Sequence, residues 1–181
     1  MRPQFVPLFT DAKGSLPPGE ALAAMGVEPR VEVVREDILS AVAQQLIRSL
    51  NAELSDRYPE EGATHFRLHA EEVAEGRGAF LVAYLASTPV GCGAVRVIGE
   101  AVGEIKRMYV SPAVRGRGVG LAVLDALEAE ARRLGIRRLV LETGVRQQEA
   151  LALYGRVGYS PIPAFGEYVD SPLSVCLGKD L

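Results

Sequence analysis

The order of hydrophobic and polar positions divides the chain into strand-like and helix-like segments. The apolar run Val31–Val34 predicts a first strand. Asp37 then offers a helix N-cap, and Pro59 disfavours helical geometry just before it, so we expect a helix between Asp37 and about Arg57–Tyr58. The apolar positions of this helix fall on one face, and they are Leu39, Val42, Ala43, Leu46, Leu50 and Leu54.

The middle of the chain predicts an antiparallel sheet. Three strand-like runs, Ala79–Ala86, Val90–Ile98 and Val102–Val110, follow one another with only short links between them. Close spacing of this kind favours a three-stranded meander. The alternation of apolar residues breaks between Ile105 and Met108, which indicates a β-bulge in the third run.

The last third of the chain alternates helices with strands. Helix Val119–Leu134 has an apolar stripe (Leu121, Leu124, Leu127, Ala131 and Leu134), and Gly135 is placed to end it. The later elements are strand Arg138–Thr143, helix Gln148–Val157, and strands Tyr159–Pro163 and Ser174–Leu177. A meander that passes into a β-α-β unit predicts an α/β fold of the mixed α+β kind, with helices on both faces of the sheet.

Composition and charge bear on the domain organisation, the partners and the location of the chain. Residues 1–30 are rich in Pro and Gly, so we expect an irregular N-terminal arm, with a short helix at Glu20–Met25, outside one domain at residues 31–181. The net charge of −3 gives no global basic excess, and we expect neither a nucleic-acid partner nor a membrane partner. The N-terminus lacks the apolar segment of a signal peptide, which favours a cytoplasmic location.

A glycine-rich loop carries the most specific chemistry. Between a strand that ends near Val110 and a helix that begins near Val119 lie Arg115, Gly116, Arg117, Gly118 and Gly120. Free amides at a helix N-terminus, glycines that admit close approach, and nearby arginines suit a diphosphate. A P-loop is excluded because no Lys-Ser/Thr pair follows, and the dinucleotide fingerprint fails because Leu121 stands at its third glycine.

This loop resembles the pyrophosphate-binding motif of the GCN5-related N-acetyltransferases (GNAT). A second stretch, Gln147 to Tyr154 followed by Gly158-Tyr159, is similar to the family's Asn-x-x-Ala-x-x-Leu-Tyr signature with its later Gly-Phe/Tyr. The resemblance covers about residues 31–181. Gln147 departs from the Asn of many members, and because its side chain is longer we expect a different contact at the start of that helix.

The resemblance implies acetyl-CoA as co-substrate, lying in a split between the strands Glu104–Val110 and Arg138–Thr143. Backbone amides around the bulge would hold the pantetheine and the thioester, and those of the loop would hold the pyrophosphate. The cofactor-binding residues implied are Met108, Tyr109, Val110, Arg115, Gly116, Arg117, Gly118, Val119, Gly120, Thr143 and Gln147. No metal is implied, and the HxxxH pair His65 and His69 does not read as a helical metal site.

Direct transfer needs a base for the amine and a proton donor for the leaving thiolate. The resemblance places Tyr154 at the coenzyme A sulfur, and a phenol with a pKa of about 10 is a protonated donor at neutral pH. Glu104 is the candidate base, although a strand carboxylate can equally be only solvated. Cys92 and Cys176 have no base nearby in sequence, so we expect a ternary complex rather than an acetyl-enzyme.

The acceptor is expected to be the amine of a small molecule. Arg57 and Tyr58 end the first helix, and Tyr168 lies in a late loop, so these residues are the candidates for acceptor binding, although Arg57 can also be a solvated helix-end cation. Acetylation of a protein lysine or N-terminus, and a non-catalytic acyl-CoA-binding regulatory role, stay open as alternatives. Homodimers are common in the family, and we expect one here.

Overall fold

A computed structural model describes residues 30–60 and 68–181. The predicted N-terminal arm up to residue 29, its short helix at Glu20–Met25, and His65 lie outside the described residues. The boundary of the predicted domain at residue 31 therefore stays a prediction.

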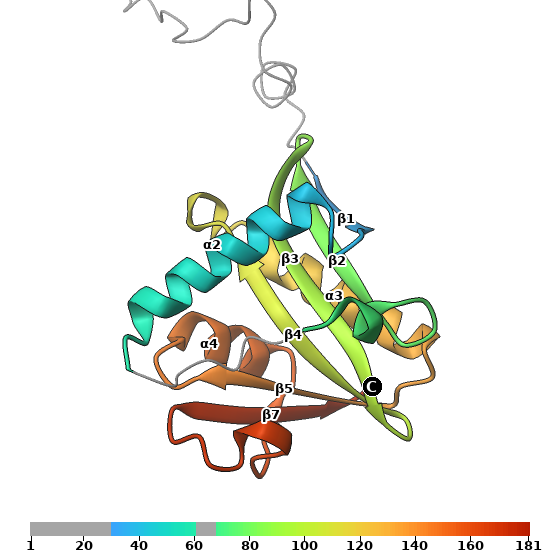
Figure 1. Ribbon diagram of the computed structural model, residues 1–181, viewed down its shortest axis with the longest axis vertical. Helices are drawn as coiled ribbons and strands as arrows, with labels where there is room; N and C mark the ends of the chain where they lie inside the picture. Colours follow the sequence, from blue (N-terminus) through green and yellow to red (C-terminus); the bar gives the residue numbers. More distant parts are fainter. Residues whose placement is uncertain (1–29, 61–67) are drawn as a thin grey trace, which may run out of the picture.

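A seven-stranded sheet runs through the described part of the chain in the order β1-β2-β3-β4-β5-β7-β6 (Figure 1). Strands β1 to β4 pair antiparallel, β4 and β5 pair parallel, and β7 pairs antiparallel with both β5 and β6. The expected mixed sheet, a meander followed by a β-α-β unit, is confirmed. The strands are β1 (Val31–Arg35), β2 (Gly78–Leu85), β3 (Thr88–Gly99), β4 (Val102–Val110), β5 (Arg138–Gly144), β6 (Ser160–Pro161) and β7 (Ser174–Asp180).

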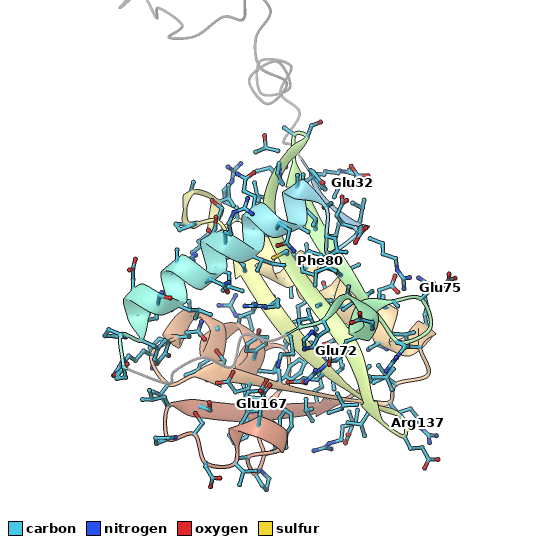
Figure 2. All side chains as sticks on the ribbon, in the orientation of Figure 1. Glu32, Glu72, Glu75, Phe80, Arg137 and Glu167 are labelled. Carbon is cyan, nitrogen blue, oxygen red and sulfur yellow. The ribbon has the colours of Figure 1, made fainter. Side chains whose placement is uncertain are left out.

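Helices cover both faces of the sheet. Helix α2 (Ala41–Arg57) lies across one face, where its buried residues pack with Phe80 of β2 (Figures 1 and 2). Helix α3 (Val119–Arg133) and helix α4 (Gln148–Arg156) pack on the opposite face around a larger apolar cluster. Three 3₁₀ turns complete the described elements, namely η1 (Ala70–Val73), η2 (Pro112–Val114) and η3 (Gly166–Tyr168). No helix in the described ranges is long and apolar enough to cross a membrane.

Two details of the predicted helices are wrong. Ser40, not Asp37, caps α2, because its hydroxyl accepts from the amide of Ala43 at 3.1 Å, whereas Asp37 accepts from the amide of Leu39 in a preceding turn. Leu39 therefore stays outside the helix and is 68% exposed. In α3 the buried face includes Val119 and Val123, which turns Leu121 toward solvent.

The final strands also differ from the prediction. Strand β6 contains only Ser160 and Pro161, because prolines supply no backbone donor to extend the ladder. Strand β7 is longer than expected and reaches Asp180. Its full-length pairing with β5 fixes the loop before it, which contains η3, beside the open end of the sheet.

The sheet splits halfway along β4. Strand β5 pairs with β4 only from Val102 to Ile105, while β3 stays paired with β4 to Val110. At the split the register with β3 shifts, and Arg107 adopts a left-handed φ of 61°. The predicted bulge is therefore confirmed, and it falls where β4 and β5 separate.

Candidate active site

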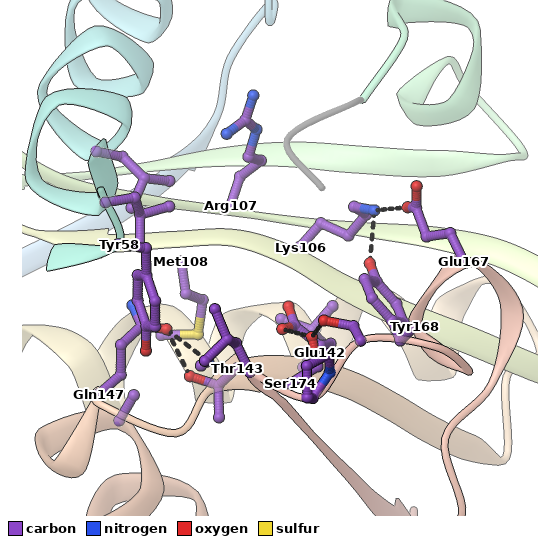
Figure 3. Close-up of a pocket in the computed structure, with 18 of the residues that line it drawn as sticks. Tyr58, Lys106, Arg107, Met108, Glu142, Thr143, Gln147, Glu167, Tyr168 and Ser174 are labelled. Atoms are coloured by element: carbon purple, nitrogen blue, oxygen red, sulfur yellow. Dashed lines mark hydrogen bonds and ion pairs between the residues drawn. The ribbon is translucent and has the colours of Figure 1, made fainter. Parts of the chain in front are cut away.

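A cavity of about 660 Å³ occupies the split between β4 and β5 (Figure 3). Its walls come from β4, β5, the C-terminal half of α2, the start of α4 and the loop around η3. The lining residues predicted from the sequence are Tyr58, Met108, Thr143, Gln147, Tyr154 and Tyr168. Segments far apart in the sequence thus meet at one concave site.

The bulge decides which β4 side chains face which side of the cavity. Successive strand residues normally point to opposite faces, but the extra residue lets Lys106 and Arg107 point to the α2 side together. Lys106 donates to the Tyr168 hydroxyl at 2.7 Å, and Arg107 donates to Asn51 of α2 at 2.7 Å. Met108 then packs on the α3 side, opposite Arg107 (Figure 3).

The predicted diphosphate loop follows β4 but does not line this cavity. Gly116 and Gly118 adopt positive φ angles of 76° and 81°, and a Cβ at either would project into open space. Gly118 is the N-cap of α3, and the amides of Val119, Gly120 and Leu121 have no acceptor among the described residues. These are the open donors that an anion at a helix N-terminus requires.

Glycine at position 120 serves packing as well. A Cβ there would lie 3.2 Å from Leu153 of α4 and 3.6 Å from Val110 of β4. Absence of a side chain lets the first turn of α3 approach the end of β4. The loop amides are thereby held next to the strand that leads into the cavity.

Arg115 and Arg117 contribute to the loop in different ways. Arg115 donates through Nε to the carbonyl of Val110 at 3.1 Å and pairs with Glu53 of α2 at 2.5 Å. Its side chain therefore ties the loop to α2. Arg117 is exposed. Tyr109 and Val110, also predicted to bind the cofactor, lie outside the cavity lining, so a role for them depends on their backbone groups.

Gln147 makes a contact that its greater length allows. Its Oε1 accepts from the Thr143 hydroxyl at 2.8 Å and from the amide of Gly144 at 2.9 Å. The side chain thus holds the end of β5 and does not cap the first turn of α4.

Tyr154 lies in the wall on the α3–α4 side. Its ring packs edge-on against Tyr159, with the ring centroids 5.7 Å apart, and its hydroxyl makes no hydrogen bond within the described part of the chain. Burial raises the pKa of the Tyr154 phenol, and the carboxylate of Glu142 raises this pKa further. Tyr154 is therefore protonated at neutral pH and keeps its proton for a partner in the cavity.

Glu104 is placed differently from what its predicted role requires. Its carboxylate is 1% exposed, accepts from Arg96 Nε at 2.8 Å and from the Tyr168 hydroxyl at 2.8 Å, and is not part of the cavity lining. Such a carboxylate is committed to a buried ion-pair network. This placement argues against Glu104 as the base and favours a role in holding Tyr168.

Arg57 and Tyr58, the neighbouring residues at the end of α2, have different surroundings. Tyr58 lines the cavity, and its hydroxyl accepts from the amide of Arg146 at 2.8 Å. Gly144 lies so close to this hydroxyl that no side chain fits there. Arg57 instead pairs with Glu53 at 3.0 Å and with Glu149 at 3.1 Å, outside the cavity lining. The reading of Arg57 as a helix-end cation fits the structure better than acceptor binding.

Tyr168 closes the cavity on the η3 side. Its ring lies under Lys106, with Nζ 5.3 Å from the ring centroid, and its hydroxyl joins Lys106 to Glu104. Burial raises the pKa of Tyr168, and the Glu104 carboxylate adds to this rise. Lys106 also donates to Glu167 at 2.9 Å, so two residues of the η3 turn are fastened to β4 (Figure 3).

Glu142 was missed by the sequence reasoning. It lies on β5 just beyond the last pair with β4, lines the cavity, and accepts from the Ser174 hydroxyl at 2.6 Å. Leu141 packs in the core on the α3 side, so alternation along β5 turns Glu142 to the α2 side. A charged residue directly after the apolar run from Leu139 to Leu141, within the predicted strand, was the available signal.

His69 lies outside the cavity lining, where it caps η1 together with Glu72. Residues 30–60 and 68–181 contain no group of three His, Cys, Asp or Glu side chains arranged to hold a metal ion.

Known proteins resemble this chain in sequence and in fold. Residues 43–159 match the acetyltransferase (GNAT) family. An IAA acetyltransferase of Azospirillum brasilense is 40% identical over 84% of this chain and 99% of its own. An amino-acid acetyltransferase of Mycobacterium tuberculosis is 36% identical over 51% of this chain and 50% of its own. A solved structure from Klebsiella pneumoniae, described as an acyl-CoA N-acyltransferase, covers 83% of this chain and 97% of its own, with 34% identity and a TM-score of 0.70.

A mixed sheet split between β4 and β5, with a bulged β4 leading into a glycine-rich helix start, defines an acyltransferase fold. The chain belongs to the acetyltransferase (GNAT) family, and the predicted resemblance is confirmed. It is an acetyl-CoA-dependent N-acetyltransferase.

Proposed function

We propose that the chain transfers the acetyl group of acetyl-CoA to the amine of a small molecule inside the cavity at the β4–β5 split. The observation that carries this proposal is the meeting of Tyr154, Glu142 and the bulged strand at one cavity of about 660 Å³. A site of this size suits a small ligand beside the end of a cofactor arm. Acetyl-CoA supplies the activated acetyl group as a thioester.

Residues of the chain fit the co-substrate in three places. The open amides at the start of α3 would bind the diphosphate, with Gly116 and Gly118 leaving room for it. Backbone groups of β4 beyond Ile105, which lose β5 as a partner, would bind the pantetheine arm and the thioester oxygen. Thr143 and Gln147 form the opposite wall at the end of β5.

Tyr154 and Glu142 supply the proton transfers in this proposal. The amine nitrogen bonds to the acetyl carbon, the carbon–sulfur bond breaks, and the amine proton passes to Glu142, directly or through a water. The phenol of Tyr154 donates its proton to the leaving sulfur. Return of a proton from Glu142 to Tyr154 restores both groups, so atoms and charge balance over one turnover.

A direct transfer is favoured over an acetyl-cysteine intermediate. Burial raises the pKa of the Cys92 thiol to about 12, and burial also raises the pKa of Cys176. Neither cysteine lines the cavity. At neutral pH neither thiol is an activated nucleophile, which supports attack by the amine itself in a ternary complex.

Tyr154→Phe tests this assignment. We expect kcat to fall by about 10²-fold, while the Kd for acetyl-CoA changes little, because general acid catalysis contributes on that scale. The readout is thiol release from acetyl-CoA with a panel of small amines, and calorimetry gives the Kd. Tyr159→Phe is the matched control, since Tyr159 contacts Tyr154 but lies outside the cavity lining.

Unchanged turnover in Tyr154→Phe would remove its role. Acetyl-CoA binding without acetylation of any small amine would favour the two alternatives, transfer to a protein amine or a regulatory role. The expected cytoplasmic location, homodimer and independence from metal stay predictions.

A further inference from the structure

The Tyr58 hydroxyl carries a proton that no described residue accepts. Tyr58 is 8% exposed and lines the cavity, and its hydroxyl oxygen accepts from the amide of Arg146 at 2.8 Å. A phenol can also donate one hydrogen bond, but no group in residues 30–60 and 68–181 receives it. Burial raises the pKa of Tyr58, so the phenol keeps its proton at neutral pH. Because buried donors normally have a partner, a ligand in the cavity is the available acceptor.

A missing side chain places this hydroxyl at the end of β5. The Tyr58 hydroxyl occupies the position that a Cβ of Gly144 would take. Strand β5 keeps its register with β7 from Glu142 to Gly144, so these two residues face the same side of the sheet. The Tyr58 hydroxyl therefore lies on the face of β5 that carries the Glu142 side chain, roughly 7 Å farther along the strand. The Glu142 carboxylate adds to the rise in the pKa of Tyr58, which agrees with this proximity.

Arg146 holds the phenol from outside the cavity. Its guanidinium lies over the Tyr58 ring, with Cζ 5.1 Å from the ring centroid, donates to the carbonyl of Arg57 at 2.9 Å, and pairs with Glu60. Arg57 in turn donates to the carbonyl of Arg146 at 3.4 Å, so the end of α2 and the turn before α4 are joined in both directions. The amide and the positive charge of Arg146 lower the pKa of Tyr58 against the larger effect of burial. A phenol polarised in this way is a stronger hydrogen-bond donor.

We propose that the acetyl acceptor carries, besides its amine, an oxygen that accepts a hydrogen bond from Tyr58, and that Arg146 is a positioning residue for this contact. The inference rests on the proposed function, because it names the class of acceptor for the same cavity. With the amine at Glu142, an ether, hydroxyl or carbonyl oxygen roughly two to four bonds from the nitrogen would reach the Tyr58 hydroxyl, as the spacing along β5 and the length of a hydrogen bond allow.

Pairs of amines that differ in one oxygen test the proposal. 2-Methoxyethylamine is compared with n-butylamine, 3-methoxypropylamine with n-pentylamine, and 2-phenoxyethylamine with 3-phenylpropylamine, where a methylene replaces the oxygen. The readout is kcat/KM of the ether divided by that of its partner, measured at one pH in wild type and in Tyr58→Phe, so that differences in amine basicity cancel. We expect Tyr58→Phe to lower this ratio about 5-fold in at least one pair, as the loss of one neutral hydrogen bond predicts.

Tyr84→Phe is the matched control, because the Tyr84 hydroxyl donates to Glu36 outside the cavity lining. Its ratios should equal those of wild type. Ratios that Tyr58→Phe leaves unchanged in all three pairs would overturn the inference, since the activity that remains in this variant comes from folded protein.

Arg146→Gln tests the positioning role. The variant keeps the backbone amide that contacts the Tyr58 hydroxyl but loses the cation over the ring and the hold on Arg57. We expect the same ratio to fall about 2-fold, with partial recovery in Arg146→Lys, as the loss of an exposed cation–π contact predicts. Arg138→Gln is the control, since Arg138 pairs with Asp180 outside the cavity lining. A lower melting temperature with an unchanged ratio would remove Arg146 from this role.

A binding experiment separates this inference from the proposed function. The N-acetyl derivatives of the same amines are titrated by calorimetry against wild type and Tyr58→Phe, with no acetyl-CoA present. Tighter binding of an ether derivative than of its partner, lost in Tyr58→Phe, supports the inference even if acetyl transfer fails. Equal binding within every pair contradicts it even if the amines are acetylated.

Discussion

The two sides of the cavity offer different chemical groups to a ligand. On the α3–α4 side the groups available to a ligand are the apolar side chains and the Tyr154 phenol that line the cavity, with the open backbone amides at the start of α3 lying beyond it. On the α2 side they are charged side chains from β4, β5 and the η3 turn. Backbone amides serve any chain with the same fold, whereas charged side chains can change one by one. We propose from this comparison that the α3–α4 side binds the common co-substrate and the α2 side binds the acceptor.

The largest effect is expected from Glu142→Gln, which alters the α2 side at the reacting groups. We expect kcat/KM for the acceptor to fall by about 10²-fold or more, because the amide cannot accept the amine proton. Steady-state kinetics with acetyl-CoA at saturation measure the change.

Glu104→Gln sharpens the same prediction. This change leaves Arg96 and Lys106 beside a neutral amide in a buried network, so we expect a lower melting temperature and a smaller loss of kcat than in Glu142→Gln. A larger kcat loss in Glu104→Gln, with folding intact, would restore Glu104 as the base and remove Glu142 from that role.

Gly118→Val tests the α3–α4 side alone. A β-branched residue strains the left-handed N-cap and fills the open space beside the α3 amides. We expect KM for acetyl-CoA to rise about 10-fold or more, and KM for the acceptor to stay within about two-fold, as the loss of one charge-assisted contact predicts. If instead the acceptor KM rises and the acetyl-CoA KM does not, the division between the two sides is wrong.

Tyr168→Phe probes how the α2 side is held together. Its hydroxyl joins Lys106 to Glu104 in a buried network, and leaving these groups without it should lower the free energy of unfolding by about 1–3 kcal/mol. Thermal unfolding, monitored by circular dichroism, measures the change. An unaltered melting temperature would show that the network does not depend on this hydroxyl.

The smallest effect on activity is expected from the cysteines. The Cys92 thiol is protonated in the folded state, with a pKa raised from 9.0 to about 12, so iodoacetamide at pH 8 should leave Cys92 unmodified and activity intact. Because the folded pKa exceeds the unfolded one, the stabilisation is complete below pH 9 and is lost as the pH rises toward 12. Mass spectrometry after alkylation and melting temperatures from pH 8 to 11 check both statements.

The sequence predicted the α3–α4 side better than the α2 side, for a physical reason. Gly116, Gly118 and Tyr154 were predicted from local features, a turn before a helix and a position in a short signature, and such features are visible in adjacent letters of the sequence. The fold and the bulge were predictable for the same reason, since alternation and turn residues are local. The short β6 and the exposed Leu39 are the places where strand pairing and helix capping, rather than the local sequence pattern, set the end of an element.

The α2 side depends on contacts between distant segments. Whether Glu104 or Glu142 faces the cavity depends on the strand that each lies on and on where β4 and β5 separate. That Lys106 and Arg107 share a face depends on the residue at which the bulge falls. Arg57 was expected at the acceptor, but Glu53 and Glu149 hold it elsewhere. Only the assembled sheet supplies this information.

Calorimetric titration of the wild-type chain with acetyl-CoA, beside free coenzyme A, tests whether the chain binds this co-substrate. We expect saturable one-to-one binding of acetyl-CoA, with Kd between about 1 μM and 1 mM as for ordinary enzyme substrates, and then release of thiol when an acceptor amine is added. Absence of binding at millimolar acetyl-CoA would contradict it, because the α3 loop would then be a turn that holds no diphosphate.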